Sequence, residues 1–109
     1  MTPTARSLSL LRSEGYAAAV VERWIPGANI RKDLFGVGDI LAVHAERREF
    51  LLVQATTRDH VSPRLRKAES IPELATWLQA GGRFQVWGWS KRRGRWEVRR
   101  EPVDLAAIA

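Results

Sequence analysis

The sequence predicts a single α/β domain in which helices pack on the faces of a mixed β-sheet. A chain of 109 residues has the length of one domain. Two apolar runs, 38–45 (GDILAVHA) and 49–56 (EFLLVQAT), are joined by a short charged turn, which is typical of a β-hairpin. Helix-type patterns precede and follow this hairpin, and two strand-like segments come near the end of the chain. The predicted order is therefore helix, three strands, helices, two strands.

The first part of the chain predicts a helix followed by a strand. Leucines in residues 4–12 recur at helical spacing, and Gly15 can close that helix in a left-handed turn. Residues 16–24 (YAAAVVERW) favour a strand, because their aromatic and β-branched side chains suit a pleated surface. Continuation of the helix through Gly15, at a cost of about 1 kcal/mol against alanine, is the alternative. Residues 28–37 show neither period and are predicted to be irregular.

Two helices are predicted after the first hairpin. Ser62 and Pro63 form a typical helix start, with serine as the cap and proline at the first helical position. Ser70 and Glu73 have the spacing of a capping box, which predicts a second helix. Glycines at 81–82 are expected to end that helix.

A second hairpin is predicted from residues 83–90 and 95–101, which alternate like paired strands. Trp87 and Trp89 are two apart and therefore share one face of their strand. With Trp96 opposite them, a cross-strand aromatic cluster is expected. Packing against the C-terminal tail or a dimer partner is the favoured role of these tryptophans, and a stacking platform for unpaired bases is the alternative.

The composition predicts a soluble, cytoplasmic protein with a polyanionic partner. The chain has no cysteine, which excludes disulfides, thiolate zinc sites and cysteine nucleophiles. It has no apolar run near the roughly 20 residues that span a bilayer. Its net charge of +6 comes mostly from arginine, whose guanidinium group pairs with phosphate oxygens. A nucleic acid, DNA in preference to RNA, is the expected partner, and arginines that only confer solubility are the alternative. A homodimer would enlarge the core of so small a domain.

The basic residues are unevenly placed, with one group after the first hairpin and another around the last turn. His60 lies in the first group and is expected near phosphate, whereas His44 is expected to cap the hairpin. The residues expected to contact nucleic acid are Arg58, His60, Arg64, Lys67, Lys91, Arg92, Arg93 and Arg95.

Two polar residues interrupt the apolar strands of the first hairpin. Asp39 begins one strand directly after Gly38, and Gln54 lies near the end of the next. Because the start of one antiparallel strand faces the end of its partner, these side chains are expected to meet. A carboxylate and an amide oxygen suit a hard cation such as Mg²⁺. The alternative is structural, with Asp39 capping a turn and Gln54 bonding to a neighbouring backbone group.

At these residues the chain resembles the PD-(D/E)XK, or restriction-endonuclease-like, nuclease superfamily. The resemblance spans roughly residues 4–100 and is carried by a helix, Glu-Gly-Tyr, a strand, Gly-Asp-Ile-Leu-Ala-Val, a tight hairpin and Leu-Leu-Val-Gln-Ala-Thr. The nearest members in size are archaeal and phage Holliday-junction resolvase-like proteins. The resemblance implies an α-β-β-β-α-β core and a DNA endonuclease that depends on Mg²⁺ or Mn²⁺, with branched or structured DNA as a candidate substrate.

The resemblance also assigns roles to individual residues. Asp39 falls on the metal-binding aspartate, and Gln54 falls where the superfamily has an acidic residue. The carbonyl of Ala55 would complete the metal shell. Thr56 falls on the catalytic lysine position, so the motif reads D…QxT.

Two of these positions depart from the superfamily pattern. Glutamine keeps an oxygen ligand but loses a charge, so weaker metal binding is expected. Threonine cannot supply the positive charge that stabilises the phosphate. Lys67 or Arg64, three residues apart on the following helix, is expected to replace it, with Lys67 preferred. Asp33, in preference to Glu22, is expected to supply a further negative charge to the metal.

These departures leave a second function open, a nucleic-acid-binding module that keeps the fold without catalysis. A protein-interaction domain of a phage or mobile element is a third possible function. The nuclease is the leading hypothesis, with Asp39, Gln54, Lys67 and Arg64 as the catalytic residues and Asp39, Gln54, Ala55 and Asp33 around the metal.

Overall fold

The computed structural model describes residues 1–108 of the chain. In chain order the elements are α1 (Pro3–Ser13), β1 (Ala17–Val20), β2 (Arg23–Ile25), β3 (Ile30–Lys32), β4 (Ile40–His44), β5 (Glu49–Thr57), the 3-10 turn η1 (Arg58–His60), α2 (Val61–Glu69), α3 (Pro72–Gln79), β6 (Arg83–Arg92), β7 (Arg95–Pro102) and α4 (Leu105–Ile108).

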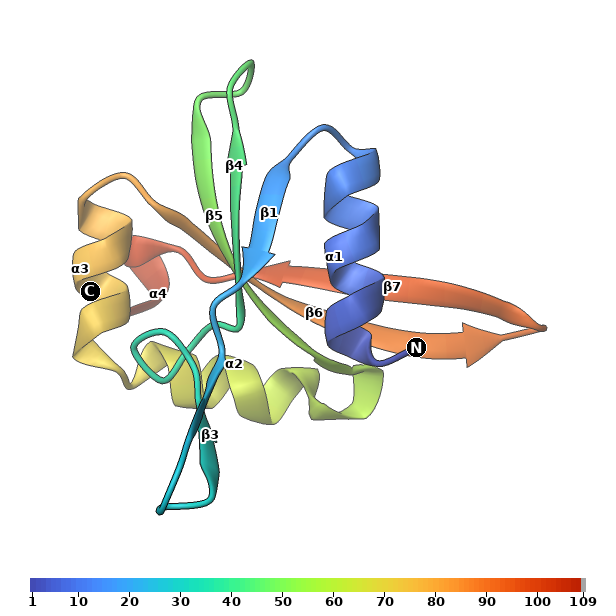
Figure 1. Cartoon of the computed structure of the whole chain (residues 1–109). Helices are drawn as coiled ribbons and strands as arrows, with labels where there is room; N and C mark the ends of the chain where they lie inside the picture. The colour runs from blue at the N-terminus through green and yellow to red at the C-terminus, as the bar shows by residue number, and fades with distance from the viewer. Residues whose placement is uncertain (109) are drawn as a thin grey trace.

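A five-stranded mixed sheet in the order β1-β4-β5-β6-β7 organises the domain (Figure 1). Strands β1, β4 and β5 form an antiparallel meander. The chain then crosses over through α2 and α3 and returns as β6, which is parallel to β5, and β7 pairs back on β6. The predicted α/β class with a mixed sheet is confirmed. Strands β2 and β3 form a separate two-stranded sheet.

Helices cover both faces of the main sheet, which gives three layers. One apolar cluster joins α1 to the sheet through residues such as Leu11, Ile40 and Trp87. The other joins α2 and α3 to the opposite face through residues such as Leu52, Leu74 and Phe84. Strand β5 therefore contributes alternate side chains to the two faces, as its near-continuous apolar run predicted.

The segment between α1 and β4 differs from the prediction. The predicted strand at 16–24 is broken, because β1 ends at Val20, where the Val21 N–H bonds to the carbonyl of Asp39 at the edge of β4. The predicted irregular stretch at 28–37 contains β3, which pairs with β2 through a turn that includes Gly27 at φ 88°. Proline and glycine in this turn favour a local hairpin over continuation of β1.

The two predicted serine caps are also wrong. Helix α2 begins at Val61 after the 3-10 turn, and α3 begins at Pro72 with Ile71 in the cap position; neither has a side-chain cap bond. The Ser70 hydroxyl instead donates to the Lys67 carbonyl at 2.6 Å. Ser70 therefore satisfies the end of one helix, which prevents it from capping the next.

The predicted cross-strand tryptophan cluster does not form. The two-residue turn between β6 and β7 sets a register in which Trp96 lies opposite Lys91, well beyond Trp87 and Trp89. Trp87 and Trp89 share a face as predicted, and both pack in the cluster under α1. These two residues therefore pack against α1 and not against the C-terminal tail, and Trp96 is not in their cluster.

Candidate functional site

Asp39 and Gln54 meet at one end of the β4–β5 hairpin, as its antiparallel pairing predicted. Ile40 lies opposite Val53, so Asp39 and Gln54 come next to each other one position beyond the paired residues. The Gln54 amide donates to Asp39 Oδ2 at 3.4 Å, and the Ala55 N–H donates to Asp39 Oδ1 at 3.1 Å. The carboxylate is therefore fixed across the two strands, and its position depends on β5.

A glycine directly before Asp39 allows this close approach. A Cβ on Gly38 would lie 2.2 Å from Leu52 Cγ, which is nearer than two non-bonded carbon atoms can approach. The backbone of residue 38 therefore packs directly on the Leu52 side chain of β5. This close packing places Asp39 against β5, and only 5% of Asp39 is exposed.

The surroundings of Asp39 disfavour its charged form. Burial raises its pKa, an effect that the Ala55 N–H bond opposes, and the negative charges of Asp33 and Glu22 raise it further, to about 7. Asp33 and Glu22, the two residues predicted as possible sources of a further negative charge at the metal, thus both act electrostatically on Asp39. None of the ion pairs among residues 1–108 gives Asp39 a cationic partner. A divalent cation would relieve this concentration of negative charge.

The donor set fits a magnesium ion better than a metal held wholly by side chains. Within residues 1–108, no three histidine, aspartate or glutamate side chains converge closely enough to hold a metal ion by themselves. Asp33 therefore does not share a preformed ligand shell with Asp39. Mg²⁺ commonly uses one or two carboxylates and keeps several waters, which Asp39, the Gln54 amide oxygen after an amide flip, and the Ala55 carbonyl can accommodate.

Thr56, on the lysine position of the resemblance, is buried on the same side of β5 as Gln54. Its neighbour on β6 is Gly88. A Cβ on Gly88 would lie 2.2 Å from Val61 Cγ2 and 2.9 Å from Arg58 Cα, so the start of α2 rests directly on β6. The helix with the candidate replacement cations therefore begins beside Thr56.

Arg64 and Lys67 lie on one flank of α2. The side facing the sheet carries Val61, Leu65 and Ala68, at helical spacing. Arg64 is half-buried at the border of this apolar side of the helix. Lys67 lies farther from the sheet and is exposed. No hydrogen bond or ion pair among the described residues joins either side chain to Asp39 or Gln54. Their catalytic role remains a prediction.

The other residues expected to bind nucleic acid are exposed in two separate places. Arg58 and His60 lie in η1, where His60 Nδ1 is 2.8 Å from the Thr57 hydroxyl. Arg92 lies near the tip of the β6–β7 hairpin, which projects from the body of the domain (Figure 1). Arg92 comes six residues after Val86, the β6 neighbour of Gln54, a distance of about 20 Å along an extended strand. The tip also carries Lys91, Arg93 and Arg95, all exposed.

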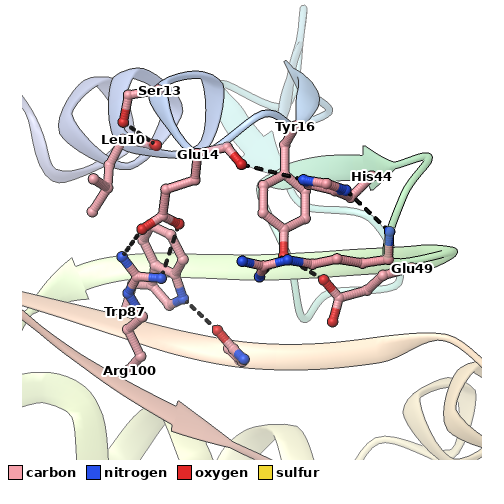
Figure 2. Close-up of polar contacts among 10 residues, drawn as sticks. Leu10, Ser13, Glu14, Tyr16, His44, Glu49, Trp87 and Arg100 are labelled. Carbon is pink, nitrogen blue, oxygen red and sulfur yellow. Dashed lines mark hydrogen bonds and ion pairs between the residues drawn. The ribbon is translucent and has the colours of Figure 1, made fainter.

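A second polar cluster, which the sequence did not reveal, lies at the other end of the β4–β5 hairpin (Figure 2). Glu49 is buried, accepts a hydrogen bond from the Tyr16 hydroxyl and pairs with Arg83 at 2.8 Å. Burial raises the pKa of Tyr16, and the bond to Glu49 raises it further. His44 Nδ1 accepts the Arg47 N–H at 3.2 Å, which confirms that His44 caps the hairpin.

The same cluster extends to α1 and β7. Arg100 bonds to both carboxylate oxygens of Glu14, at 3.0 and 2.7 Å, and its guanidinium lies 4.3 Å from the centre of the Trp87 ring (Figure 2). Glu14 pairs with Arg100 and Glu49 pairs with Arg83, so both carboxylates of the cluster have a guanidinium group beside them. This cluster ties α1 to the sheet and has the character of a structural network.

Comparison of the chain with protein-family models, with curated proteins and with solved structures gave no match. None of the helices within residues 1–108 has both the length and the hydrophobicity that crossing a membrane requires.

Proposed function

We propose that the protein is a metal-dependent nuclease with a restriction-endonuclease-like core, and that it cleaves DNA. The observation that carries this proposal is the buried carboxylate of Asp39, which β5 holds in place. The charges of Asp33 and Glu22 act on it, and no ion pair among residues 1–108 neutralises it. The strand order supports it, because a helix, a three-stranded meander, a helical crossover and a parallel strand reproduce the α-β-β-β-α-β order of the superfamily it resembles.

Asp39, Gln54 and the Ala55 carbonyl would hold Mg²⁺ or Mn²⁺, with Asp33 adding negative charge nearby. When bound, such an ion polarises a phosphodiester and lowers the pKa of an attacking water. The protein's own part is to fix Asp39 against β5 and to exclude water from its buried side. Arg64 or Lys67 would stabilise the charge on the phosphate, in place of the lysine that Thr56 lacks.

The positive groups around η1 and at the β6–β7 tip would bind the sugar-phosphate backbone. Arg58 and His60 lie at the start of α2, beside the strand that carries Gln54 and Thr56. Arg92 and its basic neighbours lie farther along β6, beyond Trp89, the β6 partner of Thr57, which directly precedes η1. Contacts at both places would spread along the nucleic acid rather than concentrate at one phosphate.

Two observations favour a second candidate function. Thr56 and Gln54 remove two charged groups from the superfamily pattern, and no ready group of three metal-binding side chains forms among the described residues. A nucleic-acid-binding module that has lost catalysis would have these features. It would bind DNA in a salt-sensitive manner and would be indifferent to Mg²⁺.

Cleavage assays with Asp39→Asn distinguish the two functions. We expect the wild-type protein to cut labelled duplex, single-stranded or four-way DNA with Mg²⁺ or Mn²⁺, and the variant to lose at least about 1000-fold in rate, as loss of a group that acts on the transition state does. Asp104→Asn, which neutralises an exposed aspartate on the C-terminal segment, is the matched control and should cut normally. If the wild type cuts none of the three substrates with either metal, the nuclease proposal is wrong.

A further inference from the structure

The β2–β3 hairpin, residues 23–32, forms an arm that leaves and rejoins the sheet beside Asp39. Strand β1 ends at Val20, whose partner is Ile40, and the chain returns through the turn 34–38 directly into Asp39. Figure 1 shows the arm projecting from the sheet past α2. Glu22 and Asp33, which flank the arm, are the two acidic residues whose charges act on Asp39. The base of the arm is therefore part of the surroundings of the candidate site.

The surface of the arm combines positive charge with an exposed aromatic ring. Its ten residues include Arg23, Arg31 and Lys32 and no acidic residue. Trp24 lies opposite Arg31, and Arg23 lies opposite Lys32. Trp24 is 53% exposed and Ile30 is 52% exposed. Such a mixture of guanidinium groups and bare aromatic surface suits a flexible polyanion that carries flat apolar groups.

The turn that follows the arm holds a second exposed aromatic ring. Phe35 has φ 56°, a left-handed conformation that an aromatic residue adopts only at a cost of about 1 kcal/mol or more. Its side chain is nonetheless 49% exposed, so burial does not compensate for the strain. A shallow hollow connects this ring with the arm and is lined by Val21, Arg23, Lys32, Asp33, Leu34 and Phe35.

The arm is poorly supported by the protein itself. A two-stranded hairpin without a third strand or a helix to pack against is marginally stable in water. The other exposed tryptophan, Trp96, has the Arg6 guanidinium 3.6 Å from its ring centre, so one face of that ring is covered. None of the cation–π or ring contacts among residues 1–108 involves Trp24. Its ring is thus open to an external partner.

We propose that the arm binds unpaired bases of a nucleic acid beside Asp39, with Trp24 stacking on a base and Arg23, Arg31 and Lys32 contacting the flanking phosphates. Phe35 provides a second stacking surface at the entrance to the hollow. Because an aromatic side chain stacks on a base only where that base has left the duplex, the substrate class is a strand with unpaired bases, as in a flap, a branch point or a single strand. This inference rests on the proposed function for the role of Asp39 but concerns binding.

The test measures binding without metal, so it does not depend on catalysis. Fluorescence anisotropy in EDTA would follow labelled oligothymidylate, oligouridylate and a blunt duplex. For at least one single-stranded probe we expect Trp24→Ala to weaken binding about 10-fold, since base stacking on an aromatic residue contributes ~1–3 kcal/mol. Trp24→Phe should retain most of the affinity, because phenylalanine also stacks. Binding of the blunt duplex should be unchanged in both variants.

Phe50→Ala is the matched control, since Phe50 is an equally exposed aromatic residue on β5 away from the arm. It should bind all probes as the wild type does. The inference is overturned if Trp24→Ala binds single strands normally, or if single-stranded and duplex probes lose affinity equally. It is also overturned if sedimentation shows that Trp24→Ala converts a dimer to a monomer, because the arm would then bind a second copy of the chain.

Binding and cleavage separate this inference from the proposed function. A protein that binds single strands through Trp24 and cuts no DNA would retain the arm's role and lose the nuclease proposal. A protein that cuts DNA with Mg²⁺ but binds equally well after Trp24→Ala would retain the nuclease and lose the role of the arm.

Discussion

Two buried carboxylates lie at opposite ends of the same hairpin, and their surroundings are opposite in sign. Glu49, at the start of β5, is 8% exposed, and Asp39, directly before β4, is 5% exposed. Glu49 pairs with Arg83. It also accepts a hydrogen bond from the Tyr16 hydroxyl (Figure 2). The Asp39 carboxylate accepts hydrogen bonds from the neutral Gln54 amide and the Ala55 N–H, and the charges of Asp33 and Glu22 also act on it.

The difference shows which carboxylate stabilises the fold and which one has surroundings suited to a ligand. The ion pair with Arg83 offsets the cost of removing the Glu49 carboxylate from water, so the protein alone stabilises its negative charge. Asp39 has lost water without gaining a cation, and its raised pKa is the result. Ionisable groups with strongly perturbed pKa values are often found together at functional sites.

The largest effect we expect on stability comes from Asp39→Asn in metal-free protein. The pKa of Asp39 is about 7 in the folded state, compared with its ordinary value of 3.8, so the folded state keeps this proton to higher pH. Folded protein therefore binds more protons than unfolded protein between these values, and stability falls as pH rises from about 4 to about 7. The variant lacks this loss and should be more stable than the wild type at pH 8 by on the order of 4 kcal/mol. After an amide flip, Gln54 can bond to the new amide.

Urea unfolding in EDTA at pH 4 and pH 8 would measure this difference. The wild type and Asp39→Asn should agree closely at pH 4 and diverge at pH 8. A variant that is less stable than the wild type at pH 8 would show that the Asp39 charge is stabilised in the folded state, and the contrast with Glu49 would disappear.

Glu49→Gln should have the opposite sign. It weakens the bonds to Arg83 and the Tyr16 hydroxyl, and bonds to a charged group contribute about 2 kcal/mol. We expect the free energy of unfolding at pH 8 to fall by about this amount. Glu46→Gln, an exposed glutamate in the neighbouring turn, is the control and should change little. Equal stability of the two variants would mean that Glu49 is not a structural anchor.

The parts of the fold that the sequence predicted depend on local patterns. The hairpin 38–56 was predictable because strand period and turn chemistry agree over a short stretch, and the meeting of Asp39 with Gln54 follows from antiparallel pairing alone. The arm was missed because β2 and β3 have three residues each, too short for a recognisable period.

The parts that the sequence could not predict depend on distant contacts. Tyr16 and Arg83 reach Glu49 across 33 and 34 residues, and nothing in the local pattern marks these partners. The same is true of Trp96, because the register of the last hairpin depends on where its turn falls. The serine caps failed because a hydroxyl can bond to either of two neighbouring helix ends.

The smallest effect, and the one closest to function, is stabilisation of the folded protein by Mg²⁺. An ion that binds at Asp39 in the folded state only should stabilise the wild type by about 1.4 kcal/mol at ten times its dissociation constant. Asp39→Asn should show no such gain, whereas Glu49→Gln should keep it, because Glu49 has no part in the site. Thermal unfolding with MgCl₂, compared with NaCl at matched ionic strength, would measure this. Equal gains in all three proteins would indicate nonspecific binding, and the two ends of the hairpin would then differ in stability without differing in ligand binding.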